Sequence, residues 1–173
     1  MMKKYIFAIA ALIFSQVALA DPASIWIFSG KDALNAGSRV KHFGRTYQVE
    51  QESDFGHIRW RLGYDNEGTL PCKSLDRGCK RDGIYAMPVA IYHFTDRLET
   101  SASGGMYLFD ETHEDQYSYS VTHGAAMIAA LGATYQPTKW IAVQARFQHI
   151  EFASDSRSVD QFLVGVGFTP ANW

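Results

Sequence analysis

Beyond its first 20 residues, the sequence lacks any apolar run that approaches the ~20 residues of a membrane-spanning helix. It also lacks an excess of positive charge, because 16 basic and 18 acidic side chains leave a net charge of −2. Bulk electrostatics therefore gives no support for nucleic-acid binding. Helical spacing of apolar residues is missing as well, which argues against an α-helical domain.

Residues 1–20 have the pattern of a secretory signal peptide. "MMKK" supplies positive charge, "YIFAIAALIF" is apolar, and "ALA" supplies the small residues of a cleavage site that precedes Asp21. This pattern predicts export of the chain. The remaining residues, 21–173, are enough for a single domain with its own core or for one closed barrel.

Cysteine is scarce, and the only two, Cys72 and Cys79, lie close together in "CKSLDRGC". Because export places the chain in an oxidising compartment, we expect these two cysteines to form a disulfide that staples one loop. A metal site is the alternative, but the segment lacks further ligands at the usual spacing. We therefore predict no metal and no cofactor.

Strict alternation between apolar and polar residues takes the place of helical patterns. It is clearest in "GHIRWRLGY", which begins at Gly56. The apolar face of this segment consists of Ile58, Trp60, Leu62 and Tyr64. The polar face consists of His57, Arg59, Arg61 and Asp65. Such a period of two residues indicates a strand with two different faces.

The alternation predicts eight strands, near residues 24–30, 38–48, 55–66, 83–95, 98–110, 123–136, 140–153 and 159–169. Two of the links, "TDR" at 95–97 and "PTK" at 137–139, are tight turns, whereas 67–82 and 111–122 are long and polar. Outer-membrane barrels alternate short periplasmic turns with long external loops. We therefore predict an all-β fold, an eight-stranded antiparallel transmembrane β-barrel of the bacterial outer membrane.

In this barrel the apolar faces would contact lipid and the polar faces would line the interior. Aromatic residues near strand ends fit the girdles at the two membrane interfaces; they are Trp60, Tyr64, Tyr135 and Trp140. An eight-stranded barrel is barely wide enough for its own side chains, so we expect a polar plug and no conducting pore. The predicted plug consists of His57, Arg59, Arg61, Glu99 and Arg146.

The stretch "WIAVQARFQHIEF" interrupts its apolar face with His149 and Glu151. On the following strand, Asp160 and Ser158 have the parity of the apolar face. A tight link at Ser154-Asp155 would place His149 opposite Asp160 and Glu151 opposite Ser158, near the outer-leaflet boundary.

Such a patch suits hydrolysis. A carboxylate of Asp160 or Glu151 would orient the imidazole, and His149 would take a proton from Ser158 or from water. The alternative is a polar external rim, which any such barrel carries and where charge costs little. In the same way, "FDETHED" at 109–115 has the carboxylates of a Ca²⁺ site but lacks the regular spacing of a calcium loop, which favours a solvated acidic loop.

The segment "ARFQHIEFASD" resembles the motif of outer-membrane lipid A deacylases of the PagL type, through Arg146, Gln148 and His149, with Asp160 in the place of the acid. The resemblance implies an eight-stranded barrel that hydrolyses an ester-linked acyl chain of lipid A at the outer leaflet. The sequence departs from the family at the nucleophile, because Glu151 occupies the position of the serine and Phe152 that of the following asparagine. Ser158 is the substitute by position.

A second resemblance covers more of the chain. The blocks "GYDNEG", "RDG", "GGMYLFDET" and "HG" are similar, in that order, to blocks of small outer-membrane barrels, which implies the architecture alone.

Three functional hypotheses follow from these patterns. The first is an outer-membrane barrel that binds or modifies lipid A, with outer-membrane lipids and lipopolysaccharide as partners. The second is a non-catalytic surface barrel with structural or adhesive loops. The third is a soluble periplasmic barrel that binds a lipid inside, with its apolar faces turned inward.

Overall fold

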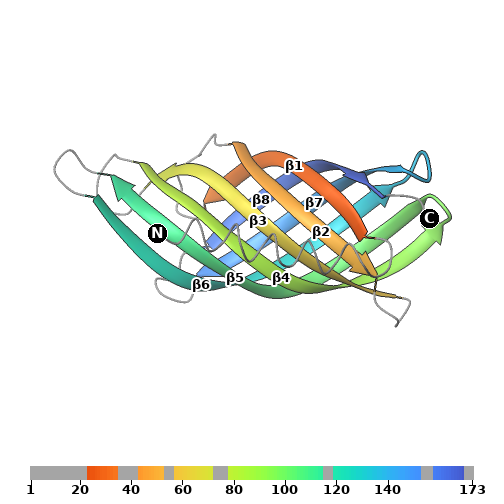
Figure 1. Cartoon of the computed structure of the whole chain (residues 1–173), viewed down its shortest axis with the longest axis horizontal. Helices are drawn as coiled ribbons and strands as arrows, with labels where there is room; N and C mark the ends of the chain where they lie inside the picture. The colour runs from red at the N-terminus through yellow and green to blue at the C-terminus, as the bar shows by residue number, and fades with distance from the viewer. Residues whose placement is uncertain are drawn as a thin grey trace.

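The computed structural model describes residues 23–34, 43–52, 57–71, 78–114, 119–152 and 158–169. They form eight strands: β1 (Ala23–Leu34), β2 (Phe43–Glu52), β3 (Ile58–Pro71), β4 (Gly78–Thr95), β5 (Leu98–Glu114), β6 (Tyr119–Tyr135), β7 (Ile141–Phe152) and β8 (Ser158–Phe168). Each strand pairs antiparallel with the next, and β8 pairs with β1, so the sheet closes into a barrel (Figure 1). The predicted fold class is confirmed. The described residues include no helix long and apolar enough to cross a membrane.

Two predictions concern residues that lie outside the described part of the chain. The predicted signal peptide, residues 1–20, is one of them. Cys72 is also outside the described residues, and only the backbone position of Cys79 in β4 is described. The disulfide therefore stays a prediction.

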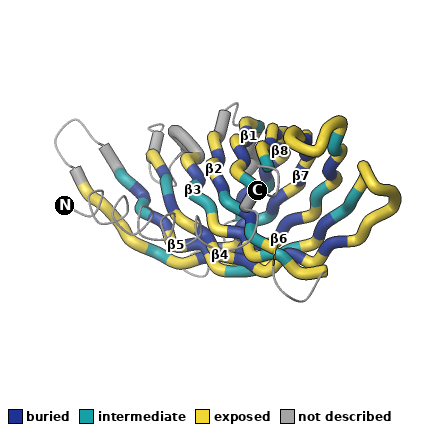
Figure 2. Tube along the Cα trace, turned by 45° about the vertical axis from the view of Figure 1, so that its right-hand side comes forward, coloured by how far each residue is buried: buried dark blue, intermediate teal, exposed yellow. Residues whose placement is uncertain are grey.

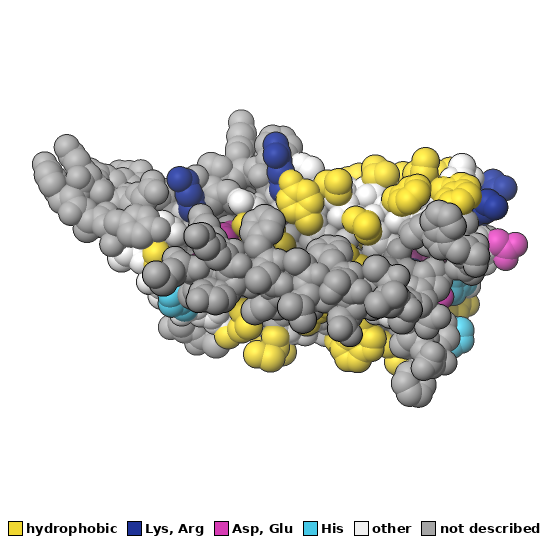
Figure 3. Space-filling view, in the orientation of Figure 1, with side chains coloured by type: hydrophobic (Ala, Val, Ile, Leu, Met, Phe, Trp, Pro, Cys, Tyr) yellow, Lys and Arg dark blue, Asp and Glu magenta, His cyan; other side chains and the backbone are white. Residues whose placement is uncertain are grey.

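Burial alternates residue by residue along the strands, as Figure 2 shows. In β7 the exposed and buried positions form an unbroken series from Ile141 to Gln148. Large apolar side chains are exposed on the outside, among them Ile27, Leu62, Leu108, Leu131, Phe147, Phe162 and Val166. They gather over the barrel wall in Figure 3. An outer wall of this composition is the surface that lipid covers.

The interior is not polar throughout, contrary to the prediction. An apolar cluster, led by Tyr85, Met87, Tyr107, Phe109, Ile128, Ile150 and Phe152, fills one part of it. A smaller cluster of Trp26, Phe28, Ala142 and Leu163 lies against β8. β4 is apolar on both faces, so alternation alone does not say which face turns inward. Close packing of these side chains leaves no room for a wide channel.

Glycines in β8 let two large rings lie flat against the inner wall. A Cβ at Gly165 would lie 2.3 Å from Cδ1 of Phe28, and one at Gly167 would lie 2.5 Å from Cδ2 of Trp26. The two rings stack on each other with centroids 5.7 Å apart. Only a residue without a side chain allows this approach.

The two predicted tight turns are confirmed, and in each a threonine hydroxyl accepts hydrogen bonds from the backbone. In the β4–β5 turn, Thr95 Oγ1 accepts hydrogen bonds from the backbone N–H groups of Arg97 (3.2 Å) and Leu98 (3.0 Å). In the β6–β7 link, Thr138 Oγ1 accepts from Trp140 (3.3 Å) and Ile141 (3.1 Å). A threonine hydroxyl thus satisfies the backbone donors that a short turn leaves without partners.

The predicted long loops are wrong. β3 and β4 extend over most of 67–82 and leave only 72–77 between them, while β5 and β6 extend over most of 111–122. Polar composition suggested loops. Polar segments also form strands, however, because the backbone groups of neighbouring strands can pair even where the side chains are in water. The second strand is also shifted, to Phe43–Glu52 instead of 38–48, because Glu50 and Glu52 pair with Arg61 and Arg59 of β3.

Candidate functional site

The last hairpin, β7 and β8, has the register that the sequence predicted, and this register places four polar residues on the outer wall. His149 lies opposite Asp160 and Glu151 lies opposite Ser158. His149 Nδ1 and Asp160 Oδ1 are 2.6 Å apart, and both side chains are partly exposed, at 39% and 29%. The carboxylate therefore holds one ring nitrogen and leaves Nε2 on the other side of the ring. This arrangement can orient a base.

A second histidine–aspartate pair of the same form lies on the outer wall of β5 and β6. His123 Nδ1 and Asp110 Oδ1 are 2.6 Å apart, with the histidine side chain 58% exposed. The sequence analysis ended one strand at Asp110 and began the next at His123, but it counted Asp110 only among the carboxylates of an acidic loop and did not single out the pair.

Register partners continue this second pair into an outer polar row, which consists of Arg45, Asn66, Asp82, Asp110 and His123 on β2 to β6. Tyr64 Oη donates a hydrogen bond of 3.1 Å to Asp82 beside the row. The outer polar row and the His149–Asp160 pair lie at the border of the apolar outer wall. Charge is tolerated near a membrane interface and costs more toward the bilayer centre.

Inside the barrel, three of the predicted plug residues, Arg59, Arg61 and Glu99, lie in one ion-pair network that is joined through Glu50. Arg59 Nη1 is 2.7 Å from Glu99 Oε1, and its Nη2 is 3.3 Å from Glu52 Oε1. Arg61, which is fully buried, contacts Glu50 at 2.6 Å. The sequence analysis missed both Glu50 and Glu52, since they lie beyond the predicted end of the second strand.

Two other residues of the predicted plug, Arg146 and His57, form no ion pair among the described residues. Arg146 is buried, donates to Gln48 and to Tyr85 Oη (3.4 Å), and its guanidinium lies 4.3 Å from the centre of the Phe28 ring. His57 precedes β3 and is exposed, so it does not lie among the buried plug residues. The interior thus holds its charges in pairs and under aromatic rings, which limits the cost of burial.

A buried ion pair closes the interior on the side of the extended strands. Arg81 donates to Glu111 through Nε at 3.0 Å, and its guanidinium lies 4.0 Å from the ring centre of Phe152 and 5.2 Å from that of Phe109. The cation is therefore held between two aromatic rings and a carboxylate. These groups belong to the interior packing and are not accessible to a ligand.

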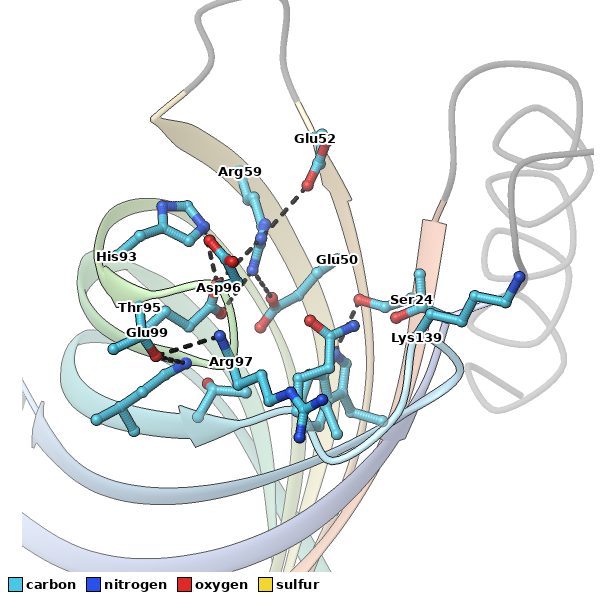
Figure 4. Close-up of a pocket in the computed structure, with 16 residues that line it drawn as sticks. Ser24, Glu50, Glu52, Arg59, His93, Thr95, Asp96, Arg97, Glu99 and Lys139 are labelled. Atoms are coloured by element: carbon cyan, nitrogen blue, oxygen red, sulfur yellow. Dashed lines mark hydrogen bonds and ion pairs between the residues drawn. The ribbon is translucent and has the colours of Figure 1, made fainter.

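At the opposite end, where the short turns lie, the barrel opens into a cavity of about 530 Å³. Figure 4 shows Arg59 between Glu50, Glu52 and Glu99, with His93 beside Glu99. Arg97 and Lys139 also line the cavity, from the two turns. The carboxylates already pair with arginine, and no group of three histidine, cysteine or acidic residues among the described residues is placed to hold a metal ion.

The extended ends of β3 to β6 form a four-stranded wall that stands beyond the rest of the barrel, at the left of Figure 1. Ser120 and Thr122 have the parity of inward-facing residues, yet both are exposed. The next inward residues of β6 that are buried are Ala126 and Ile128. The upper part of β6 is therefore open to solvent on both faces.

Comparisons with known proteins agree with this architecture. A family model, the OmpA-like transmembrane domain, matches residues 30–172. No curated protein matches the chain. The solved structure of Neisserial surface protein A (NspA) is similar at 14% identity with a TM-score of 0.70, over 86% of this chain and 96% of that chain.

Two further structures are similar. One is Ail, the attachment invasion locus protein of Yersinia pestis, in complex with the heparin analogue sucrose octasulfate, with 12% identity, a TM-score of 0.60, and 87% of this chain and 100% of that chain covered. The other is the N-terminal β-barrel domain of Pseudomonas aeruginosa OprF, with 13% identity, a TM-score of 0.56, and coverage of 84% and 97%. At these identities the likeness establishes the fold alone. None of these three is described as a lipid A deacylase, so the resemblance to PagL-type enzymes stays a prediction.

Proposed function

This chain belongs to the family of OmpA-like transmembrane domains, and on that premise we propose that it is a non-catalytic surface barrel whose extended strands contact extracellular partners. The protein is an eight-stranded barrel of the bacterial outer membrane. Its outer wall is apolar, so the alternative of a soluble periplasmic barrel with inward apolar faces is wrong.

The observation that carries the proposal is the unequal length of the strands. A tilted strand crosses the bilayer in ~9–11 residues. β1, β2, β7 and β8 have 10 to 12 residues, whereas β4, β5 and β6 have 17 or 18. The surplus belongs to one wall, β3 to β6, where it builds an ordered surface outside the membrane. A barrel that served only as a membrane anchor would not need this surface.

The neighbours support a surface role without defining a ligand. NspA is named as a surface protein and Ail as an attachment protein that was crystallised with a heparin analogue. In this chain the residues from Asp110 to Ser120 contain no lysine or arginine. Of their four carboxylates, Glu111 is buried against Arg81, and Asp110, Glu114 and Asp115 make the hairpin acidic. Such a tip repels sulfated polysaccharides, so we expect a protein partner at the β5–β6 hairpin.

A shortened hairpin tests the proposal. Residues 110–123 are replaced by an Asn-Gly turn, which joins Phe109 to Gly124 and keeps the pairing below them. Cells that produce this variant should lose adherence to immobilised extracellular proteins, while the heat-modifiable migration of the barrel is retained. Asp96→Asn in a short turn is the matched control and should adhere like the parent. Unchanged adherence of the shortened variant would refute the proposal.

A second candidate function, hydrolysis of an acyl ester at the outer leaflet, is favoured by the His149–Asp160 contact of 2.6 Å. Asp160 would orient the imidazole, and Nε2 of His149 would accept a proton from water or from the Ser158 hydroxyl as the oxygen attacks the ester carbonyl. The same proton would then pass to the leaving alcohol. His149→Ala and His149→Gln should both abolish a change in the mass spectrum of lipid A that the parent protein produces. If the parent leaves lipid A unchanged, this candidate fails and the surface role is unaffected.

A further inference from the structure

We propose that the cavity at the short-turn end of the barrel binds a short zwitterionic peptide, whose ammonium group enters the barrel and whose carboxylate stays at the mouth. The cavity measures about 530 Å³, and each of the eight strands, or a residue directly after it, contributes to its lining. Cavities of this size hold small organic ligands. The site lies at the end opposite to the β3–β6 wall, so this inference does not depend on the proposed surface function.

A row of four polar side chains crosses one inner wall at this end. The row consists of His93, Glu99, Thr134 and Gln144, which are register partners on β4, β5, β6 and β7. The His93 side chain is 48% exposed, whereas Gln144 is 1% exposed. The row therefore leads from the open cavity into the buried interior.

This row leaves one buried oxygen without a donor. Thr134 Oγ1 accepts a hydrogen bond of 2.8 Å from Gln144 Nε2, but Gln144 Oε1 has no hydrogen-bond partner among the described residues. Next along the row, Glu99 lies 3.3 Å from His93, which is charged only when protonated. An ammonium group carries three N–H donors and no acceptor. It is therefore the kind of group that a row of oxygen acceptors binds.

The charges beside the row also favour a cation. Three carboxylates share two arginines here: Arg59 lies 2.7 Å from Glu99, 3.3 Å from Glu52 and 4.0 Å from Glu50, and Arg61 pairs with Glu50 at 2.6 Å. One negative charge is thus left in excess. The Glu52 side chain is 58% exposed, so a ligand can reach it. A cavity whose walls carry charge of one sign attracts the opposite charge.

The two short turns at the mouth carry the opposite excess, with two cations, Arg97 and Lys139, and one acid, Asp96. Arg97 forms no ion pair among the described residues, and Figure 4 shows its side chain extending away from Glu99. Lys139 Nζ lies 5.2 Å from the ring centre of Trp140, so part of its charge is already used. A guanidinium binds a carboxylate through two parallel hydrogen bonds. Arg97 is therefore the group that would hold the carboxylate of the peptide.

The remaining wall of the cavity is uncharged and closed at depth. Ser24, Trp26 and Ala142 line it, and Ser24 Oγ accepts a hydrogen bond of 2.9 Å from Trp26 Nε1. Deeper in the barrel, Trp26 and Ala142 pack with Phe28 and Leu163. Small side chains of a peptide would contact this wall, and the packed interior would stop the peptide from passing further. The arrangement is that of a binding site and not of a passage.

Equilibrium dialysis of trialanine against the purified mature chain in lipid nanodiscs tests the proposal, with empty nanodiscs as the blank. N-acetyl-trialanine lacks the ammonium group, and trialanine amide lacks the carboxylate. We expect saturable binding of trialanine and an affinity at least about tenfold lower for each blocked peptide. No saturable binding of trialanine at millimolar concentration would overturn the proposal. Binding of either blocked peptide as tightly as trialanine would also overturn it.

Two variants locate the two ends of the peptide. Glu52→Gln should weaken the binding of trialanine at least about fivefold and leave N-acetyl-trialanine unchanged, because that peptide has no ammonium to lose a partner. Arg97→Gln should weaken trialanine by a similar factor and leave trialanine amide unchanged. Both side chains are exposed, so both variants should keep the parent's unfolding midpoint. Arg45→Gln, on the outer side of β2, is the matched control and should bind trialanine like the parent.

A third variant fills the ammonium position from within. His93→Lys places a tethered ammonium beside Glu99 and should weaken trialanine at least about tenfold, again without an effect on N-acetyl-trialanine. Equal effects of these variants on free and blocked peptides, or no effect of any variant on trialanine, would show that the peptide binds elsewhere and would overturn the site.

Discussion

Single residues decide how closely the interior packs, and the glycines of β8 are the clearest case. Because a Cβ at Gly165 would lie 2.3 Å from Phe28, Gly165→Val forces the ring or the strand to move. We expect this variant to lower the free energy of unfolding by about 1–3 kcal/mol. Gly104→Ala is the control, since a Cβ there would meet no atom closer than 3.8 Å. Urea titration in the same lipid should separate the two; equal stability would contradict the packing.

The buried pair of Arg61 and Glu50 gives a second prediction at this scale. Arg61→Met leaves the buried Glu50 carboxylate with a hydrogen bond from Gln48 (2.8 Å) and with Arg59 at 4.0 Å as its remaining cation. Loss of one partner of a buried pair typically costs about 3–5 kcal/mol. We expect a loss of that order in the free energy of unfolding, and recovery of much of it in the double variant Arg61→Met with Glu50→Gln.

Arg45→Gln, on the exposed outer side of β2, serves as the control for the loss of an arginine. An Arg61→Met protein as stable as the parent would show that the interior pair does not hold the barrel together.

Sequence reasoning at the residue scale succeeded where parity alone was sufficient. His149 and Asp160 were matched because both break an apolar face and because a tight link was assumed between their strands, and the register of β7 and β8 places them opposite each other. Glu50 was missed because the second strand was placed too early. The contacts of Arg81 with Phe109 and Phe152 join three strands, so no local pattern could predict them.

At the scale of one element, β7 tests which face meets lipid. Phe147 is exposed in the middle of the apolar wall, whereas Glu151 lies two outward positions further toward the polar border. Arginine on the lipid face costs ~2–4 kcal/mol at the bilayer midplane and ~0–1 near the interface. Phe147→Arg should therefore destabilise the folded barrel strongly and Glu151→Arg weakly, as measured by urea titration in bilayers. A larger loss of stability for Glu151→Arg than for Phe147→Arg would show that Phe147 does not lie near the middle of the bilayer.

The elements also show why strand ends are hard to predict. The turns at 95–97 and 137–139 were recognisable because both sides alternate cleanly up to the turn. The upper parts of β3 to β6 were assigned to loops because their composition is polar on both faces. A polar strand outside the membrane has no apolar face, so only its pairing partners reveal it.

For the molecule as a whole, the filled interior predicts a barrel without a pore. The apolar cluster, the Arg61–Glu50 pair and the Arg81–Glu111 pair together fill the interior. Reconstituted protein should give no stable conductance steps in planar bilayers and should not admit sucrose in a liposome-swelling assay. A sixteen-stranded porin is the positive control. Regular conductance steps from the purified chain would mean that the interior packing opens in the membrane.

Chain length, the signal pattern and the order of the turns sufficed for the architecture, because an even number of antiparallel strands places all short links at one end. The partly apolar interior could not be predicted, since β4 carries apolar residues such as Met87 and Ile84 on both faces. The protruding wall could not be predicted either, because it depends on the difference in length between neighbouring strands.

Site-specific labelling of intact cells tests the central claim, that β3 to β6 extend outward from a lipid-embedded barrel. In a Cys72→Ser, Cys79→Ser background, single cysteines replace Thr122 in the wall and Asp96 in the β4–β5 turn. A membrane-impermeant maleimide should label Thr122→Cys on intact cells and Asp96→Cys only after the outer membrane is permeabilised. Labelling of Asp96→Cys, but not Thr122→Cys, on intact cells would contradict the account.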